Sequence, residues 1–141
     1  MGTWAVDAFG NDYAQDWAQD LHETSNLDAV EDTLNAVLQA PPGELEAPYA
    51  AEALVAIEVL ARLQGKGGAR GDDSAAVDQW VDARKAKGKP VKPRTDLVDK
   101  AAQALERILS PDSELRQLWE ESEHYADWRA AVDDLTSRLS A

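Results

Sequence analysis

The sequence predicts an all-α protein, a compact bundle of five to seven helices with an N-terminal extended arm. Apolar residues recur every three or four positions in each long segment, as on the buried face of a helix. No alternation of apolar and polar residues lasts long enough to form a sheet. Because 141 residues is a common size for one domain, we expect a single helical domain over residues 1–141.

The first two predicted helices have clear capping residues and apolar faces. Asn11 or Asp12 can cap the first helix, and Ser25 or Asn26 the second. The apolar face of the first helix contains Ala14, Trp17, Ala18 and Leu21. That of the second contains Leu27, Val30, Leu34, Val37 and Leu38, and a Pro-Pro-Gly turn at 41–43 ends it.

A third helix, starting near Pro48, is predicted to be the central one. From Ala51 to Leu63 its only polar residues are Glu52, Glu58 and Arg62. These three fall within an arc of about 120° at helical spacing. Since the rest of the helix is apolar, it should be packed on several sides.

A fourth helix is predicted between two flexible segments, near 65–73 and 86–94. The first segment is rich in glycine, and the second combines two prolines with several bases. Asp72, Asp73 or Ser74 can cap this helix. Only three large side chains anchor it, so we expect it to dock but to detach first: Val77, Trp80 and Val81.

The last part of the chain predicts three further helical segments. Thr95 can cap the first of them, and Ser110 followed by Pro111 can start a short second one. Their apolar residues are Val98, Ala101, Ala102, Leu105, Ile108 and Leu109, and then Leu115, Leu118 and Trp119. A terminal amphipathic helix follows from Tyr125, Trp128, Val132, Leu135 and Leu139.

The charge of the chain is −13 and is unevenly distributed. Residues 1–64 hold 12 acids and one base, residues 65–94 four acids and eight bases, and residues 95–141 eleven acids and five bases. Such acidity opposes nucleic acid and anionic membranes as partners. It is typical either of a solubilising surface or of a face complementary to a basic protein.

No catalytic or cofactor constellation is apparent, and we expect no cofactor. The chain has no cysteine and only two histidines, His22 and His124. Glu121 and His124 have the Glu-x-x-His spacing of a di-iron bundle, but no second such pair exists, so an exposed histidine is expected instead. The adjacent carboxylates, such as Asp133 and Asp134, fit helix caps and polar faces better than a general acid.

Five tryptophans stand out, and those at helical spacing are expected in the core. Trp4 lies outside the helices and is the best candidate for partial exposure. Tryptophan is enriched at binding hot spots. We therefore predict a partner-binding cluster at the N-terminal end of the chain: Trp4, Phe9, Asn11, Asp12, Asp16 and Trp17.

The same opening resembles a bacterial family of unknown function, domain of unknown function 4259. Its members begin Met-Gly-x-Trp and continue Phe-x-Asn-Asp-x-Ala-x-Asp-Trp, as this chain does over residues 1–4 and 9–17. The stretches 46–48 and 113–122 are also similar to it. The resemblance implies a domain spanning nearly the whole chain and no known activity.

Two functions follow as hypotheses. The first is a non-enzymatic, acidic protein-binding module, of the immunity or regulatory type, that masks a basic partner. The alternative is a small-ligand-binding protein or an enzyme with a pocket lined by tryptophans and carboxylates. Without a signal sequence or an apolar run of spanning length, we expect a soluble, cytoplasmic protein.

Overall fold

The computed structural model describes residues 12–21, 23, 27–41, 43–64, 74–85 and 95–140. Over these residues the chain forms seven α-helices and no strand, which confirms the predicted all-α bundle. The helices are α1 (Asp12–Leu21), α2 (Asp28–Gln39), α3 (Ala47–Leu63), α4 (Ala75–Lys85), α5 (Thr95–Ile108), α6 (Glu114–Glu120) and α7 (Tyr125–Ser140). The predicted N-terminal arm and the segments 65–73 and 86–94 lie outside the described residues.

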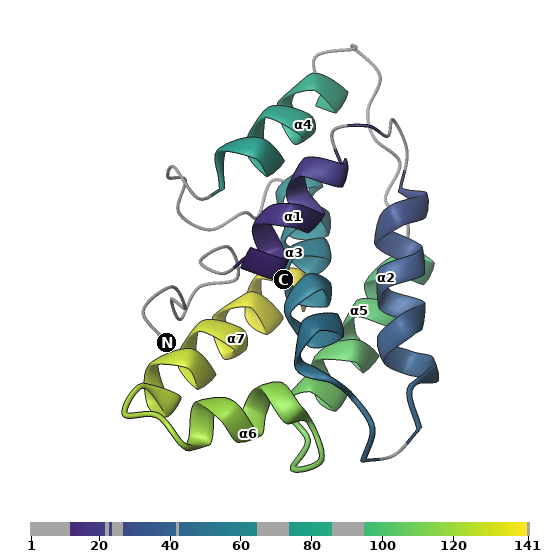
Figure 1. The fold of residues 1–141 in the computed structure, drawn as a ribbon. Helices are drawn as coiled ribbons and strands as arrows, with labels where there is room; N and C mark the ends of the chain where they lie inside the picture. Colours follow the sequence, from purple (N-terminus) through teal and green to yellow (C-terminus); the bar gives the residue numbers. More distant parts are fainter. Residues whose placement is uncertain are drawn as a thin grey trace.

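Helix α3 is the centre of the bundle and contacts each of the other six helices. In Figure 1 it runs through the middle of the molecule, with α1 in front, α2 and α5 to one side and α7 to the other. Every residue from Ala53 to Arg62 is buried. A helix surrounded in this way needs an apolar surface on nearly all sides, which is why the sequence shows no single apolar stripe there.

Three of the helices around α3, namely α1, α4 and α7, bury the faces that the sequence predicted. Helix α1 buries all four expected residues, and α4 buries its three anchors. In α7 the buried residues are Trp128, Val132, Leu135 and Leu139, at the predicted spacing of three and four. The fold therefore follows from the helical pattern in these elements.

The turn between α2 and α3 is the predicted glycine turn. Gly43 has a φ of 79°, a backbone conformation that glycine adopts without the strain of a side chain. The amide of Glu44 donates to the carbonyl of Pro41 at 3.0 Å and closes the turn. This turn sends α3 back antiparallel to α2 (Figure 1).

The residue before helix α2 is Leu27, whose side chain makes no capping hydrogen bond. Ser25 and Asn26, the predicted caps of this helix, lie outside the described residues. The predicted cap of α6 is wrong. Helix α6 is capped by Ser113, whose hydroxyl accepts from the amide of Arg116, and not by Ser110. The hydroxyl of Ser110 instead donates to the carbonyl of Arg107, at 2.7 Å, and belongs to the end of α5.

The buried face of α5 is also rotated from the predicted one. Leu97 and Ala104 are fully buried, whereas Ala102 is exposed and Val98 is half-buried. Packing of α5 against α2, α3 and α7 decides which of two adjacent apolar stripes faces inward. A single alanine weighs too little in the sequence pattern to settle that choice.

Candidate functional site

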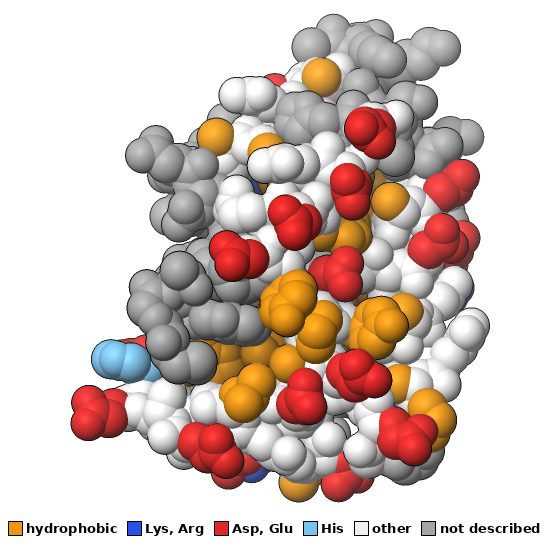
Figure 2. Space-filling view, in the orientation of Figure 1, with side chains coloured by type: hydrophobic (Ala, Val, Ile, Leu, Met, Phe, Trp, Pro, Cys, Tyr) orange, Lys and Arg blue, Asp and Glu red, His pale blue; other side chains and the backbone are white. Residues whose placement is uncertain are grey.

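The surface formed by residues 1–64 has exposed carboxylates, while the one base of this segment is buried. This base, Arg62, is only 4% exposed. Figure 2 shows carboxylates spread over the face that carries α1, α2 and the start of α3, with few basic side chains among them. The exposed carboxylates of the described part of this segment are Asp12, Asp16, Asp20, Glu23, Asp28, Asp32, Glu44 and Glu46.

Arg62 is buried because it belongs to a chain of ionised groups inside the bundle. It pairs with Glu58 one turn earlier in α3, and its Nε donates to Oδ1 of Asp78 in α4 at 2.8 Å. Ser74 donates to the other oxygen of Asp78 at 2.7 Å. Since Glu58 and Asp78 are each 6% exposed, these opposite charges must compensate one another for the loss of water.

The same chain of charges reaches α7 through Arg138. Its Nη2 donates to Oε1 of Glu58 at 2.6 Å, and its Nε donates to Asp134 at 2.8 Å. The hydrogen bonds to Glu58 raise the pKa of Arg138 above its ordinary value. Three helices, α4, α3 and α7, are thus joined by one set of charges with well-placed hydrogen bonds.

The sequence contains a signal for this buried pairing of charges. Glu58 and Arg62 stand four residues apart in a helix that is otherwise almost wholly apolar. Such residues face the same way and can pair, and burial is expected when their neighbours on all sides are buried. The carboxylates and bases of this network are therefore paired with one another inside the bundle.

Among the predicted partner-binding residues, the structure separates the acids from the tryptophan. Asp12 and Asp16 are exposed on α1. Trp17 is buried, and its indole N–H donates to the hydroxyl of Thr33 in α2 at 2.8 Å, so it joins α1 to α2. Trp4, Phe9 and Asn11 lie outside the described residues.

The other tryptophans of the described chain are core residues, as expected. Trp80 is buried under α4, and Trp119 and Trp128 stack with ring centroids 6.2 Å apart at an angle of 11°. Tyr125 packs on Trp128, and Arg116 lies over the Tyr125 ring at 5.9 Å. The contacts among these aromatic side chains hold α6 against α7.

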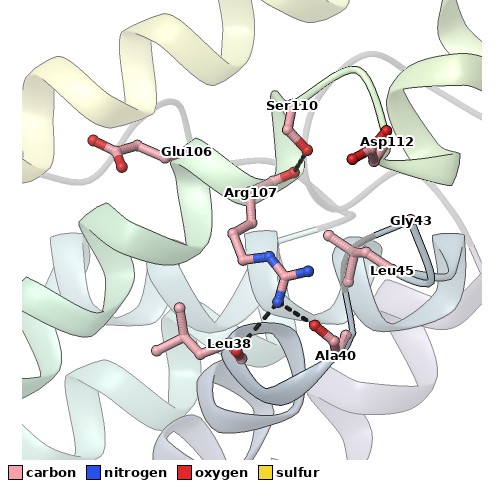
Figure 3. A pocket seen from close by; sticks show the side chains of 8 residues that line it. All are labelled: Leu38, Ala40, Gly43, Leu45, Glu106, Arg107, Ser110 and Asp112. Carbon is pink, nitrogen blue, oxygen red and sulfur yellow. Dashed lines mark hydrogen bonds between the residues drawn. The ribbon is translucent and has the colours of Figure 1, made fainter.

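A hollow of about 440 Å³ lies where the ends of α2 and α5 meet the turn before α3. Figure 3 shows the Arg107 guanidinium at its centre, with Glu106 and Asp112 on opposite sides of it. Arg107 donates to carbonyls at the end of α2, among them Val37 at 2.7 Å and Leu38 at 3.2 Å. The residues lining the hollow are Leu38, Ala40, Gly43, Leu45, Glu106, Arg107, Ser110 and Asp112.

Arg107 therefore acts as a cap for α2 and compensates the negative end of that helix. Its charge is directed to four backbone carbonyls, including those of Ala40 and Pro41, and not to an open anion site. The described residues that line the hollow include two carboxylates and no tryptophan. The hollow thus differs from the tryptophan- and carboxylate-lined pocket of the alternative hypothesis.

The histidine of the described chain is exposed, as expected. Nδ1 of His124 lies 3.9 Å from a carboxylate oxygen of Asp127 on the same side of the helix start. His22 is outside the described residues. Where the structure describes the chain, no three His, Cys, Asp or Glu side chains gather in a group that could hold a metal ion.

Fold and surface together define the class: over the described residues, an all-α bundle with many exposed carboxylates on α1 and α2 and with internal partners for the described bases of α3 and of α5 to α7. The model of the family described as "Domain of unknown function (DUF4259)" matches residues 2–131, and the chain belongs to this family. Neither a curated protein nor a solved structure matches the chain. Of the helices described, none has both the length and the apolar content to cross a membrane.

Proposed function

We propose that this protein is a non-enzymatic, acidic binding module that masks a basic protein partner. One observation carries the proposal: residues 1–64 present exposed carboxylates on α1, on α2 and before α3, while their only base is buried. A surface of one sign attracts and orients a partner of the opposite sign. Immunity-type and regulatory proteins that cover basic surfaces work by this chemistry.

The engagement of the other described cations supports the proposal. In residues 95–141 the five bases each have a carboxylate or carbonyl partner within the protein. Nζ of Lys100 lies 3.4 Å from Oε2 of Glu31, and Nε of Arg129 lies 3.3 Å from Oδ1 of Asp133. Among the described side chains, the remaining carboxylates on α1 and α2 therefore outnumber the cations that pair with them.

The test begins with a pull-down from the source cells at low and high salt, followed by kinetics with the purified partner. The expected partner is basic, is retained at low salt and is released at high salt, because salt screens exposed charges. Asp12→Asn/Asp16→Asn/Asp20→Asn should slow association on the order of tenfold at low salt. Retention of the partner that is the same at low and high salt, or a partner without a basic surface, would show that the proposal is wrong.

A matched control separates a specific face from net charge. Asp99→Asn/Glu106→Gln/Asp112→Asn also removes three exposed carboxylates, from α5 and the turn after it. Its association rate should stay close to that of the unaltered protein. Equal slowing in both variants would mean that total charge, and not the α1 face, controls association.

A further inference from the structure

Three large apolar side chains of the described chain are exposed, Tyr13, Tyr49 and Leu118, and the last two lie in α3 and α6, helices that contact each other. Tyr49, in the first turn of the otherwise buried α3, is 48% exposed, and Leu118 in α6 is 38% exposed. Neither helix needs a large apolar residue at this position, since polar residues are tolerated at exposed sites. The sequence pattern placed Leu118 with the packed residues of α6, and the structure corrects that assignment.

The starts of α3 and α6 are bonded to each other, and Tyr49 and Leu118 each stand within about one helical turn of that junction. The amide of Ala47 donates to Oε1 of Glu114 at 2.9 Å, and the amide of Glu114 donates to the carbonyl of Leu45 at 3.1 Å. Leu118 follows Glu114 by one turn on the same side of α6. Tyr49 comes two residues after Ala47, in the first turn of α3.

Carboxylates flank both apolar side chains one turn before and one turn after. Figure 2 shows hydrophobic side chains gathered in the lower middle of this face, with carboxylates around them. The cation of α6, Arg116, is engaged by Glu120 at 3.0 Å and by the carbonyl of Leu109 at 2.6 Å. We call this group of six residues the α3–α6 patch. It consists of Tyr49 with Glu46 and Glu52, and of Leu118 with Glu114 and Glu121.

We infer that the α3–α6 patch is the anchor point for a protein segment in which an apolar or aromatic side chain is flanked by lysine or arginine. This inference rests on the proposed function and specifies where and how the basic partner is held. An apolar centre with a charged rim is the usual anatomy of a protein interface, in which central apolar contacts supply most of the affinity. The carboxylate rim selects a cationic surround and rejects an acidic one.

The experiment is an amide-shift titration of the full chain with a short amphipathic peptide of leucine and lysine at helical spacing. The expected shifts concentrate at residues 46–53 and 114–121. Tyr49→Ser/Leu118→Ser should weaken binding about tenfold, the loss typical of an interface hot spot. Tyr49→Phe/Leu118→Met keeps the apolar surface and should retain binding.

The possible failures distinguish this inference from the proposed function. Shifts spread over α1 and α2, with the serine variant binding normally, would overturn the α3–α6 patch but leave electrostatic binding in place. Binding of a leucine and glutamate peptide equal to that of the lysine peptide would overturn the cationic partner. Absence of salt-dependent binding to any lysine peptide would count against both.

Discussion

Residues 12–64 and residues 95–140 use charge differently. The first segment has one base, which is buried, and most of its carboxylates are exposed, Glu58 being the buried exception. In the second segment the bases act as ties, and three of them reach across to the first segment: Lys100 to Glu31, Arg107 to the end of α2, and Arg138 to Glu58. The cations thus hold the bundle together, while the acids on α1 and α2 face solvent.

The largest expected effect comes from breaking the buried set of charges. Arg62→Met leaves Glu58 and Asp78 without their shared cation, and should lower the free energy of unfolding by about 3–5 kcal/mol. Urea denaturation measures this change.

The exposed pair Arg129 and Asp133 provides the contrast. Arg129→Met should cost only about 0–1 kcal/mol, because both side chains are already hydrated. Equal costs for the two arginines would contradict the different roles assigned to buried and exposed charge.

A smaller effect is expected at the tie between α5 and α2. Arg107→Met removes the donors to the last carbonyls of α2 and should cost about 1–3 kcal/mol. Hydrogen exchange should accelerate most in the last turn of α2. Arg107→Lys keeps the charge near the helix end but loses the forked donor, so its free energy of unfolding should lie between those of the unaltered protein and Arg107→Met. A lysine variant as unstable as the methionine variant would exclude a contribution from charge.

The smallest effect is expected at Glu52, on the boundary between surface and core. Burial, and secondly the nearby charge of Asp20, raise the pKa of Glu52 above its ordinary value of 4.5. The folded state therefore binds this proton more readily than the unfolded state, so the cost of ionising Glu52 is present at neutral pH and disappears as pH falls through the raised pKa.

Accordingly, Glu52→Gln should raise the melting temperature slightly at neutral pH. The difference should shrink toward pH 4.5, where the unaltered side chain is protonated in the folded protein. Glu106→Gln removes a carboxylate from an exposed site of α5 and serves as the control for the loss of one surface charge. A stabilisation by Glu52→Gln that persists unchanged in acid would rule out the titration of Glu52 as its cause.

The helices and the central place of α3 could be predicted because helical periodicity is a local property. Trp17, Val77 and Leu135 each stand in a pattern of three and four residues that fixes their face of the helix. The candidate site was predicted only in part. Asp12 and Asp16 were predicted as partner-binding residues and are exposed on α1. Tyr49 and Leu118 were missed because an exposed apolar residue has the same appearance in the sequence as a buried one.

The sequence by itself determined the helical class, the acidity of residues 1–64 and the lack of thiol chemistry, since composition and spacing need no partner from elsewhere in the chain. Only the tertiary structure decided which cation meets which anion. Glu58 and Arg138 are 80 residues apart, and Arg107 and Val37 are 70 apart. Contacts over such separations depend on how α3, α5 and α7 pack, so the division between buried and exposed charge is a property of the folded bundle.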